Sequence, residues 1–138
     1  DKRIKKKLPR ISSIKKLNWN KTDLVFLSLP NGEAQKIIKK NYNKFNNVKF
    51  IDLSADFRIK NIKKYQANYK IKHKAPNLVK NSIYAVSEYV KDKISSYRII
   101  SNPGCYPTSV QIPLVTQTRL STVGSTVTLV PVSPVDQI

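Results

Sequence analysis

The chain has 138 residues, of which 40% are hydrophobic and 25% are charged, and its formal net charge is +18. This length suits one ordinary domain and excludes two full ones, and the composition excludes a disordered chain. No apolar run approaches the roughly 20 residues of a membrane span, and the opening DKRIKKKLPR lacks the apolar region of a secretory signal. We therefore expect a soluble, cytoplasmic protein, and the single cysteine agrees with a reducing compartment.

The strong positive charge is typical of nucleic-acid-binding proteins. Here, however, the lysines are spread over KRIKKK, KIIKK, KNIKKY and KIKHK, each interleaved with isoleucine or asparagine. This spread favours a solvated surface, and no RNA-recognition sheet, zinc finger or helix-turn-helix motif is present. We expect no nucleic-acid partner and no membrane partner; a basic nucleic-acid-binding module stays as the alternative. A positive field also suits an enzyme of acidic metabolites.

Residues 1–20 indicate a basic, partly helical lead-in that is broken at Pro9. Trp19, near its end, is interpreted as an aromatic anchor of the core and not as a stacking surface. The apolar residues of the lead-in recur at helix-like spacings: Ile4, Leu8, Ile11, Ile14 and Leu17.

Two apolar runs of strand length follow, DLVFLSLP at 23–30 and VKFIDLS at 48–54. Between them, GEAQKIIKKNYNKF at 32–45 carries its apolar side chains on one helical face, namely Ala34, Ile37, Ile38 and Tyr42. A strand, a helix and a strand in this order predict a parallel βαβ unit, and therefore an α/β fold.

Residues 57–96 are rich in lysine, asparagine and tyrosine, and they are expected to form irregular excursions with short helices. A third apolar run at 97–101 predicts another parallel strand, which leads directly into SNPGCYPT. A helix is expected to begin at this point, after the tight turn that Pro103 and Gly104 favour.

Cys105 thus lies at a predicted helix start. Unpaired N–H groups there carry partial positive charge and stabilise a thiolate, which is the nucleophilic form of the sulfur. The same amides are suited to form an oxyanion hole. The alternative is a small buried apolar side chain, as free cysteines usually are.

Four stretches carry a family resemblance. SNPGCYPT resembles the active-site signature of the N-acetyl-gamma-glutamyl-phosphate reductase family, VFLSLPNGEA its "LPHG" loop, and IDLSADFRI its "DLSADFR" segment. In a looser form, YQANYKIKHKAPNLVKNSIYAVSEY follows the family's tyrosine, histidine and "AVYGLPE" pattern. The four stretches occur in the family's order between residues 23 and 113.

The resemblance implies an NADP-dependent enzyme of arginine biosynthesis with a catalytic cysteine at position 105. Its thiolate would attack N-acetyl-glutamyl 5-phosphate, release phosphate and form a thioester, which NADPH then reduces to the semialdehyde. Aspartate-semialdehyde dehydrogenase and the related reductase of lysine-pathway acyl phosphates are the alternatives within this class. No metal site is expected.

The loop after the first predicted strand is assigned to the cofactor by resemblance. Its residues Leu29, Pro30, Asn31 and Gly32, together with Gly104, are the candidate cofactor-binding residues. The loop lies where open α/β sheets bind their ligands. An ordinary strand-to-helix turn with Asn31 as the helix cap is equally compatible with the sequence. The family usually has histidine at position 31, which weakens a specific role for this side chain.

Ser54, Arg58 and Asn102 are the candidate substrate-binding residues. Arg58 is a possible partner for a carboxylate or a phosphate. The alternative, which we favour for the DLSADFR segment, is a structural corner in which Ser54, Asp56 and Arg58 form a salt-bridged turn.

Two further residues are given mainly structural interpretations. His73 is the only histidine, and it does not match the histidine that serves as general acid and base in the family. A surface or packing role is therefore favoured for it over catalysis. Glu88 could contact the substrate, or it could simply be a carboxylate at a helix start.

The resemblance gives residues 1–101 as a partial Rossmann-type dinucleotide-binding domain, and residues 102–138 as the cysteine helix with the divergent start of an α+β catalytic domain. The Gly-rich phosphate loop has no counterpart, because the only glycines are Gly32, Gly104 and Gly124. After Arg98 the only charged residues are Arg119 and Asp136. We expect a truncated or frame-altered fragment, with a strand around VTLVPV as the alternative. The full-length protein is expected to be a homo-oligomer, and the fragment is expected to be inactive.

Overall fold

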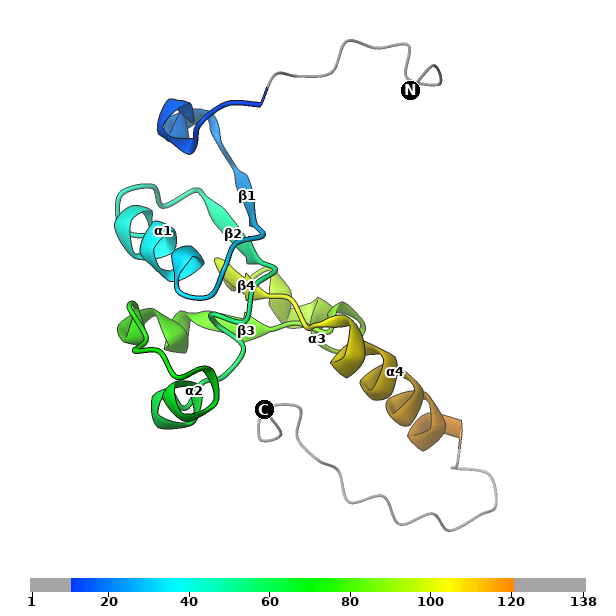
Figure 1. The fold of residues 1–138 in the computed structure, drawn as a ribbon. Helices are drawn as coiled ribbons and strands as arrows, with labels where there is room; N and C mark the ends of the chain where they lie inside the picture. Colours follow the sequence, from blue (N-terminus) through cyan, green and yellow to red (C-terminus); the bar gives the residue numbers. More distant parts are fainter. Residues whose placement is uncertain (1–10, 121–138) are drawn as a thin grey trace, which may run out of the picture.

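The computed structural model describes residues 11–120. A parallel sheet lies between helices (Figure 1). Its strands are β1 (Leu24–Leu27), β2 (Lys49–Asp52), β3 (Ser82–Tyr84) and β4 (Ile99–Ser101). The helices are α1 (Glu33–Asn41), α2 (Ile62–Tyr69), α3 (Ser87–Ile94) and α4 (Cys105–Leu120), and the 3-10 turns are η1 (Ile14–Lys16), η2 (Trp19–Lys21) and η3 (Pro76–Asn81).

The four strands have the order β1-β2-β4-β3, and all neighbouring pairs are parallel. The register places the last residues of the strands beside one another: Leu27 pairs with Asp52, Asp52 with Ser101, and Ser101 with Tyr84. Because all strands run in one direction, the loops that leave them meet at one edge of the sheet. This is the edge at which α/β proteins bind ligands.

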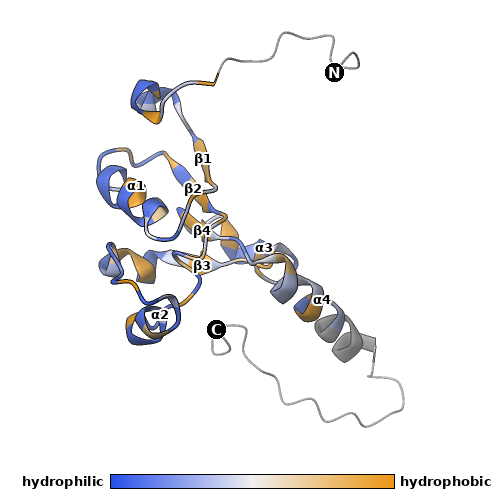
Figure 2. Ribbon diagram, viewed as in Figure 1, coloured by the Kyte–Doolittle hydropathy of each residue, from blue (hydrophilic) through white to orange (hydrophobic). Residues whose placement is uncertain are grey.

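Alternate side chains of the strands face two different helical layers. Phe50 and Ile99 belong to a core that also contains Ala34 and Ile38 of α1. On the opposite face, Ile83 and Ile100 pack with partly buried apolar residues of α3. In Figure 2, hydrophobic segments follow the strands, whereas the helices that cover them are mostly hydrophilic.

Arg98 fixes the opposite end of the sheet. Its Nε donates to the Val48 carbonyl at 3.1 Å, and its Nη2 donates to the carbonyls of Tyr42 and Phe45 at 2.9 and 2.6 Å. The guanidinium lies 4.2 Å from the centre of the Tyr42 ring, a cation–π distance. Trp19 stacks on Phe45, as expected of a core anchor.

The predicted βαβ unit, the strand before the cysteine and the α/β class are confirmed. Strand β3 was not predicted, because it has only three residues within a lysine- and asparagine-rich stretch and is too short to show the alternation of apolar and polar residues that is typical of a strand. The lead-in forms only 3-10 turns between residues 11 and 21, with Ile11, Ile14 and Leu17 exposed. Ile4, Leu8 and Pro9, and the possible strand around VTLVPV, lie outside the described residues.

Within residues 11–120, no helix is long and apolar enough to cross a membrane.

Candidate functional site

Three loops meet at the carboxyl ends of the strands. Residues 28–32 connect β1 to α1, residues 53–58 follow β2, and residues 102–104 connect β4 to Cys105. The predicted cofactor-side loop, DLSADFR segment and cysteine signature therefore lie at one edge of the sheet. The following contacts explain how they are held there.

The carboxylate of Asp56 caps α1 from a distant loop. Its Oδ1 accepts from the Gly32 N–H at 2.7 Å, and its Oδ2 accepts from the Gln35 N–H at 3.2 Å. These are among the N–H groups that a helix start leaves unpaired, and the negative charge is favourable beside them. Asp56 is fully buried and thus joins the segment after β2 to the loop after β1.

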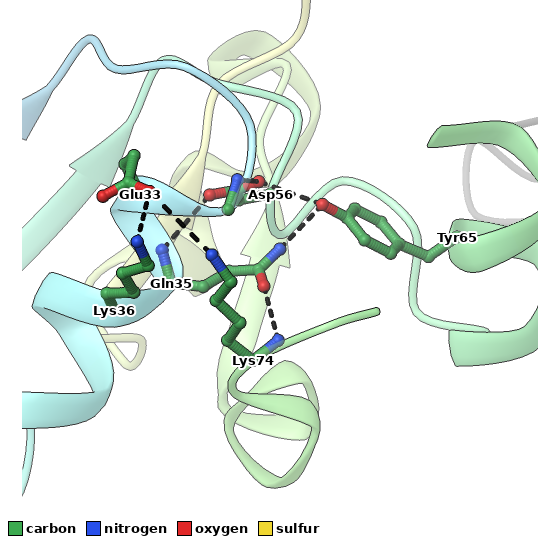
Figure 3. A network of polar contacts seen from close by, with 7 residues as sticks. Glu33, Gln35, Lys36, Asp56, Tyr65 and Lys74 are labelled. Atoms are coloured by element: carbon green, nitrogen blue, oxygen red, sulfur yellow. Dashed lines mark hydrogen bonds and ion pairs between the residues drawn. The ribbon is translucent and has the colours of Figure 1, made fainter. Parts of the chain in front are cut away.

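A buried network extends this contact to α2 and to the segment after it (Figure 3). The Tyr65 hydroxyl donates to Asp56 Oδ1 at 3.0 Å and accepts from Gln35 Nε2 at 2.7 Å. Burial, with the nearby Asp56 charge, raises the pKa of Tyr65, so that its hydroxyl remains a donor. Gln35 Oε1 in turn accepts from the Lys74 N–H at 2.6 Å.

His73 is a structural residue of the same network. Its Nδ1 accepts from the Ala75 N–H at 3.1 Å, and its Nε2 lies 2.9 Å from the Asp56 carbonyl. This pattern assigns the neutral tautomer with the proton on Nε2. Burial lowers the pKa of His73, which favours the same neutral form. Because both nitrogens are occupied by main-chain groups, the packing role is confirmed.

Asp52 organises the start of the DLSADFR segment. Its Oδ1 accepts from the N–H and the hydroxyl of Ser54, and its Oδ2 accepts from the Phe57 N–H at 3.2 Å. Burial raises the pKa of Asp52, although these hydrogen bonds oppose the shift. The hydroxyl of Ser54 lies inside this turn, and it also accepts from the Asp56 N–H at 3.2 Å.

Arg58 joins this turn to the cysteine loop. Its Nε donates to the Asn102 carbonyl at 3.0 Å, and its Nη2 donates to the Leu53 carbonyl at 3.2 Å. A Cβ added to Gly104 would lie 3.1 Å from Arg58 Nη1, so the guanidinium packs directly against this glycine. Nη1 makes no hydrogen bond to any residue that the structure describes.

The predicted salt-bridged corner is therefore wrong. Arg58 donates to carbonyl groups, and the only ion pairs among residues 11–113 join Glu33 to Lys36 and to Lys74. Asp52 and Asp56 are satisfied by N–H and O–H donors instead. The corner is held by hydrogen bonds.

Cys105 is the first residue of α4 and is exposed. Pro107 has no N–H, and the Thr108 N–H donates to the Gly104 carbonyl at 3.1 Å. In the first turn, this leaves the N–H groups of Cys105 and Tyr106 without partners among the described residues. The exposed sulfur excludes the buried apolar interpretation and leaves it accessible to a substrate.

The remaining predicted residues lie around these contacts. Pro30 and Asn31 are exposed and Leu29 is partly buried, whereas Gly32 is buried with a φ of 85°, in the left-handed region. Gly32, and not Asn31, is the cap residue of α1. Glycine suits this position because of its φ, and because a Cβ would lie 3.3 Å from Lys74 Nζ.

Asn102 is exposed, and its N–H donates to the Asp52 carbonyl at 2.8 Å. Glu88 lies in the first turn of α3 and is exposed. Two neighbouring hydroxyl groups were missed by the sequence analysis: Tyr84 Oη, which lies near the Gln111 side chain, and Ser101 Oγ are buried at the ends of β3 and β4. No group of three or more His, Cys, Asp or Glu side chains suited to a metal occurs in the described part of the chain.

Comparison with known proteins gives consistent matches. Residues 2–97 match the family described as semialdehyde dehydrogenase, NAD binding domain. The chain is 43% identical over 109 residues to the probable chloroplastic N-acetyl-gamma-glutamyl-phosphate reductase of Arabidopsis thaliana, covering 79% of this chain and 26% of that protein. It is 44% identical over 115 residues to the N-acetyl-gamma-glutamyl-phosphate reductase of Ehrlichia canis, covering 83% of this chain and 32% of that protein.

The chain therefore spans about a quarter to a third of the length of these curated relatives. A third similar protein, the probable chloroplastic reductase of Oryza sativa, is 40% identical over 112 residues, which are 81% of this chain and 26% of the rice protein.

We expect Asp56→Ala to lower the free energy of unfolding by about 2 kcal/mol, because both acceptors of the buried cap and their charge are lost together. Tyr65→Phe is the matched control, since it removes one donor from the same carboxylate and keeps the cap; its cost should be about 1 kcal/mol. Urea unfolding measures both values, and amide exchange should become faster at Gly32 and Gln35 in Asp56→Ala only. Equal costs and equal exchange in the two variants would refute the capping role.

The lowered pKa of His73 predicts a loss of stability in weak acid. Below the ordinary histidine pKa of about 6.5, the unfolded chain binds the proton more readily than the folded one. The free energy of unfolding should therefore fall as the pH is lowered from about 7 to about 5, and His73→Gln should flatten this dependence. Both proteins contain Asp52, so its contribution cancels when the stability profile of His73→Gln is subtracted from that of the parent chain. Parallel profiles would contradict the assignment.

Proposed function

The chain belongs to the semialdehyde dehydrogenase family, and we propose that it is part of an N-acetyl-gamma-glutamyl-phosphate reductase of arginine biosynthesis. The whole enzyme would reduce N-acetyl-glutamyl 5-phosphate to N-acetyl-glutamate 5-semialdehyde with NADPH and release inorganic phosphate. The observation that carries the proposal is the arrangement of one sheet edge, where an exposed Cys105 at a helix start, Arg58 and the loop 28–32 lie together. The names of the similar proteins support the choice of substrate.

In the first step, the thiolate of Cys105 attacks the carbonyl carbon of the acyl phosphate. A C–S bond forms, the C–O bond to the phosphate breaks, and inorganic phosphate leaves with the bonding electrons. The start of α4 favours the negative charge of the thiolate and of the transient oxyanion. The N–H groups of Cys105 and Tyr106, which have no partner among the described residues, are suited to donate to them.

In the second step, Cys105 holds the acyl group as a thioester and leaves as a thiolate when the aldehyde forms. A thioester accepts hydride more readily than a carboxylate does, which explains a sulfur nucleophile at this position. NADPH, when bound, supplies this hydride.

Among the described residues, candidates for contact with this cofactor occur only in the loops after β1 and β4. We assign Leu29, Pro30, Asn31, Gly32 and Gly104 to the cofactor side, because they lie at the carboxyl ends of β1 and β4. Gly32 and Gly104 are the only glycines among residues 11–120, and each packs against a side chain of the protein itself. A Gly-rich loop for the cofactor phosphates is thus not part of the described structure.

On the substrate side, we assign Arg58 and Asn102 to the region around the sulfur, and Ser54 to the turn that supports Arg58. Nη1 of Arg58, which makes no hydrogen bond to any described residue, lies against Gly104, one residue before the nucleophile, and is suited to an anionic group. The two carbonyl contacts of the same guanidinium hold the cysteine loop.

The partners and the compartment follow from this assignment. The partner is a small acyl phosphate, with no nucleic acid or membrane in the reaction, and the full-length reductase is proposed to be a homo-oligomer. The single cysteine suits a reducing compartment such as the cytoplasm. Two plant relatives are named as chloroplastic proteins.

In the full-length reductase, we expect Cys105→Ser to abolish NADPH oxidation driven by N-acetyl-glutamyl 5-phosphate. Arg58→Ala should lower kcat/KM about 100-fold, because a displacement of the nucleophile by about 1 Å costs this much. Arg58→Lys should recover little, since lysine cannot donate to both carbonyls with a planar fork.

The same assay with aspartyl phosphate and with the lysine-pathway acyl phosphate tests the choice of substrate. Faster reduction of either compound would replace the proposed substrate, and activity retained by Cys105→Ser would refute the covalent mechanism.

A further inference from the structure

Five lysines line one surface hollow beside α1. Lys36, Lys39 and Lys40 come from the helix, Lys44 from the turn after it, and Lys74 from the segment after α2. The hollow has a volume of about 610 Å³, and no acidic, aromatic or arginine residue of the described chain lines it. The hydrophilic α1 ribbon is visible in Figure 2. We call this feature the lysine hollow.

The positive charge of the lysine hollow is poorly compensated. Among the described residues, Glu33 is the one carboxylate that pairs with these lysines, through a contact with Lys36 and a distance of 3.8 Å to Lys74 Nζ (Figure 3). Lys39, Lys40 and Lys44 are exposed and form no ion pair with any described residue. Three of the five ammonium groups therefore have no anionic partner of their own.

The spacing of these lysines is unfavourable for the isolated helix. Lys36 lies three and four residues before Lys39 and Lys40, and like charges at these spacings repel each other on a helix face. The acids in the core cannot offset this repulsion, since Asp52 and Asp56 are fully buried and their oxygens accept from local donors. An anion in the hollow would relieve it.

The chemistry of the lining selects the kind of anion. Lysine binds phosphate oxygens as a compact point charge, and five such groups favour an anion that carries several charges. No aromatic ring is present on which a base could stack. We propose that the lysine hollow binds a compact polyphosphate, that is, a small molecule with at least two linked phosphates.

This proposal is independent of the reductase assignment, and it is tested by binding to the 138-residue chain. Isothermal titration calorimetry in about 0.15 M salt, where the Debye length is about 8 Å, should detect binding of inorganic tripolyphosphate to the chain, with much weaker binding of monophosphate. The triple variant Lys39→Gln, Lys40→Gln, Lys44→Gln should weaken tripolyphosphate binding about tenfold or more, since three phosphate contacts are lost. It leaves Glu33 and its two lysine partners in place.

The matched control is Lys63→Gln, Lys91→Gln, Lys93→Gln, which removes the same charge from exposed positions on α2 and α3. It should change the affinity less than about twofold, as exposed charges beyond the Debye length are screened. Equal weakening in both triple variants would overturn the proposal in favour of a general effect of net charge. Absence of tripolyphosphate binding to the parent chain would also overturn it.

Two further ligands identify the source of the phosphates. If ATP binds as tightly as tripolyphosphate, and the triple variant at Lys39, Lys40 and Lys44 weakens the binding of both ligands equally, the natural ligand is a nucleotide. Clearly weaker binding of ATP indicates free polyphosphate. The proposal would be overturned in favour of non-specific binding of nucleic acid if a DNA duplex binds more tightly than ATP and tripolyphosphate, and if both triple variants weaken DNA binding equally.

Discussion

The buried carboxylate of Asp56 is the contact on which the arrangement of the strand edge depends. A charge in the core requires donors, and here they come from the start of α1 and from Tyr65 of α2. The Asp56 carbonyl holds His73 as well, so one residue fixes the position of three segments.

The geometry of the cysteine follows from the same short segment. Arg58 lies two residues after Asp56, and its guanidinium reaches the carbonyl before Pro103 and packs on Gly104. The DLSADFR segment thus supports the loop after β1 through its aspartate and the loop before Cys105 through its arginine. The proposed division of one reduction into acyl transfer and hydride transfer would require both loops at fixed positions.

Parts of this structure could be predicted because their signals are local. Strands β1, β2 and β4 lie in continuous apolar runs, and α1 has its apolar residues on one helical face. The turn before Cys105 contains proline and glycine in the expected places. Strand β3 has three residues and shows no period, although the apolar run from Ile83 to Val86 marks its position.

The contacts that were missed are those between distant segments. Gly32 donates to a carboxylate 24 residues away, and no local pattern distinguishes this cap from one made by Asn31. In the same way, Arg58 lies two residues after Asp56 in the sequence and was expected to pair with it, but its side chain is turned toward the carbonyl groups of Asn102 and Leu53. The lysines of the hollow also looked evenly spread until the fold placed Lys74 beside α1.

The most direct test of the account is to trap the acyl group on the intact reductase. The full-length protein is incubated with N-acetyl-glutamyl 5-phosphate in the absence of NADPH, and its peptides are analysed by mass spectrometry. The account predicts an N-acetyl-glutamyl group on the peptide that contains Cys105, released by hydroxylamine as a thioester, with one phosphate set free per acyl group. Acylation of a different residue, or phosphate release without acylation of Cys105, would contradict it.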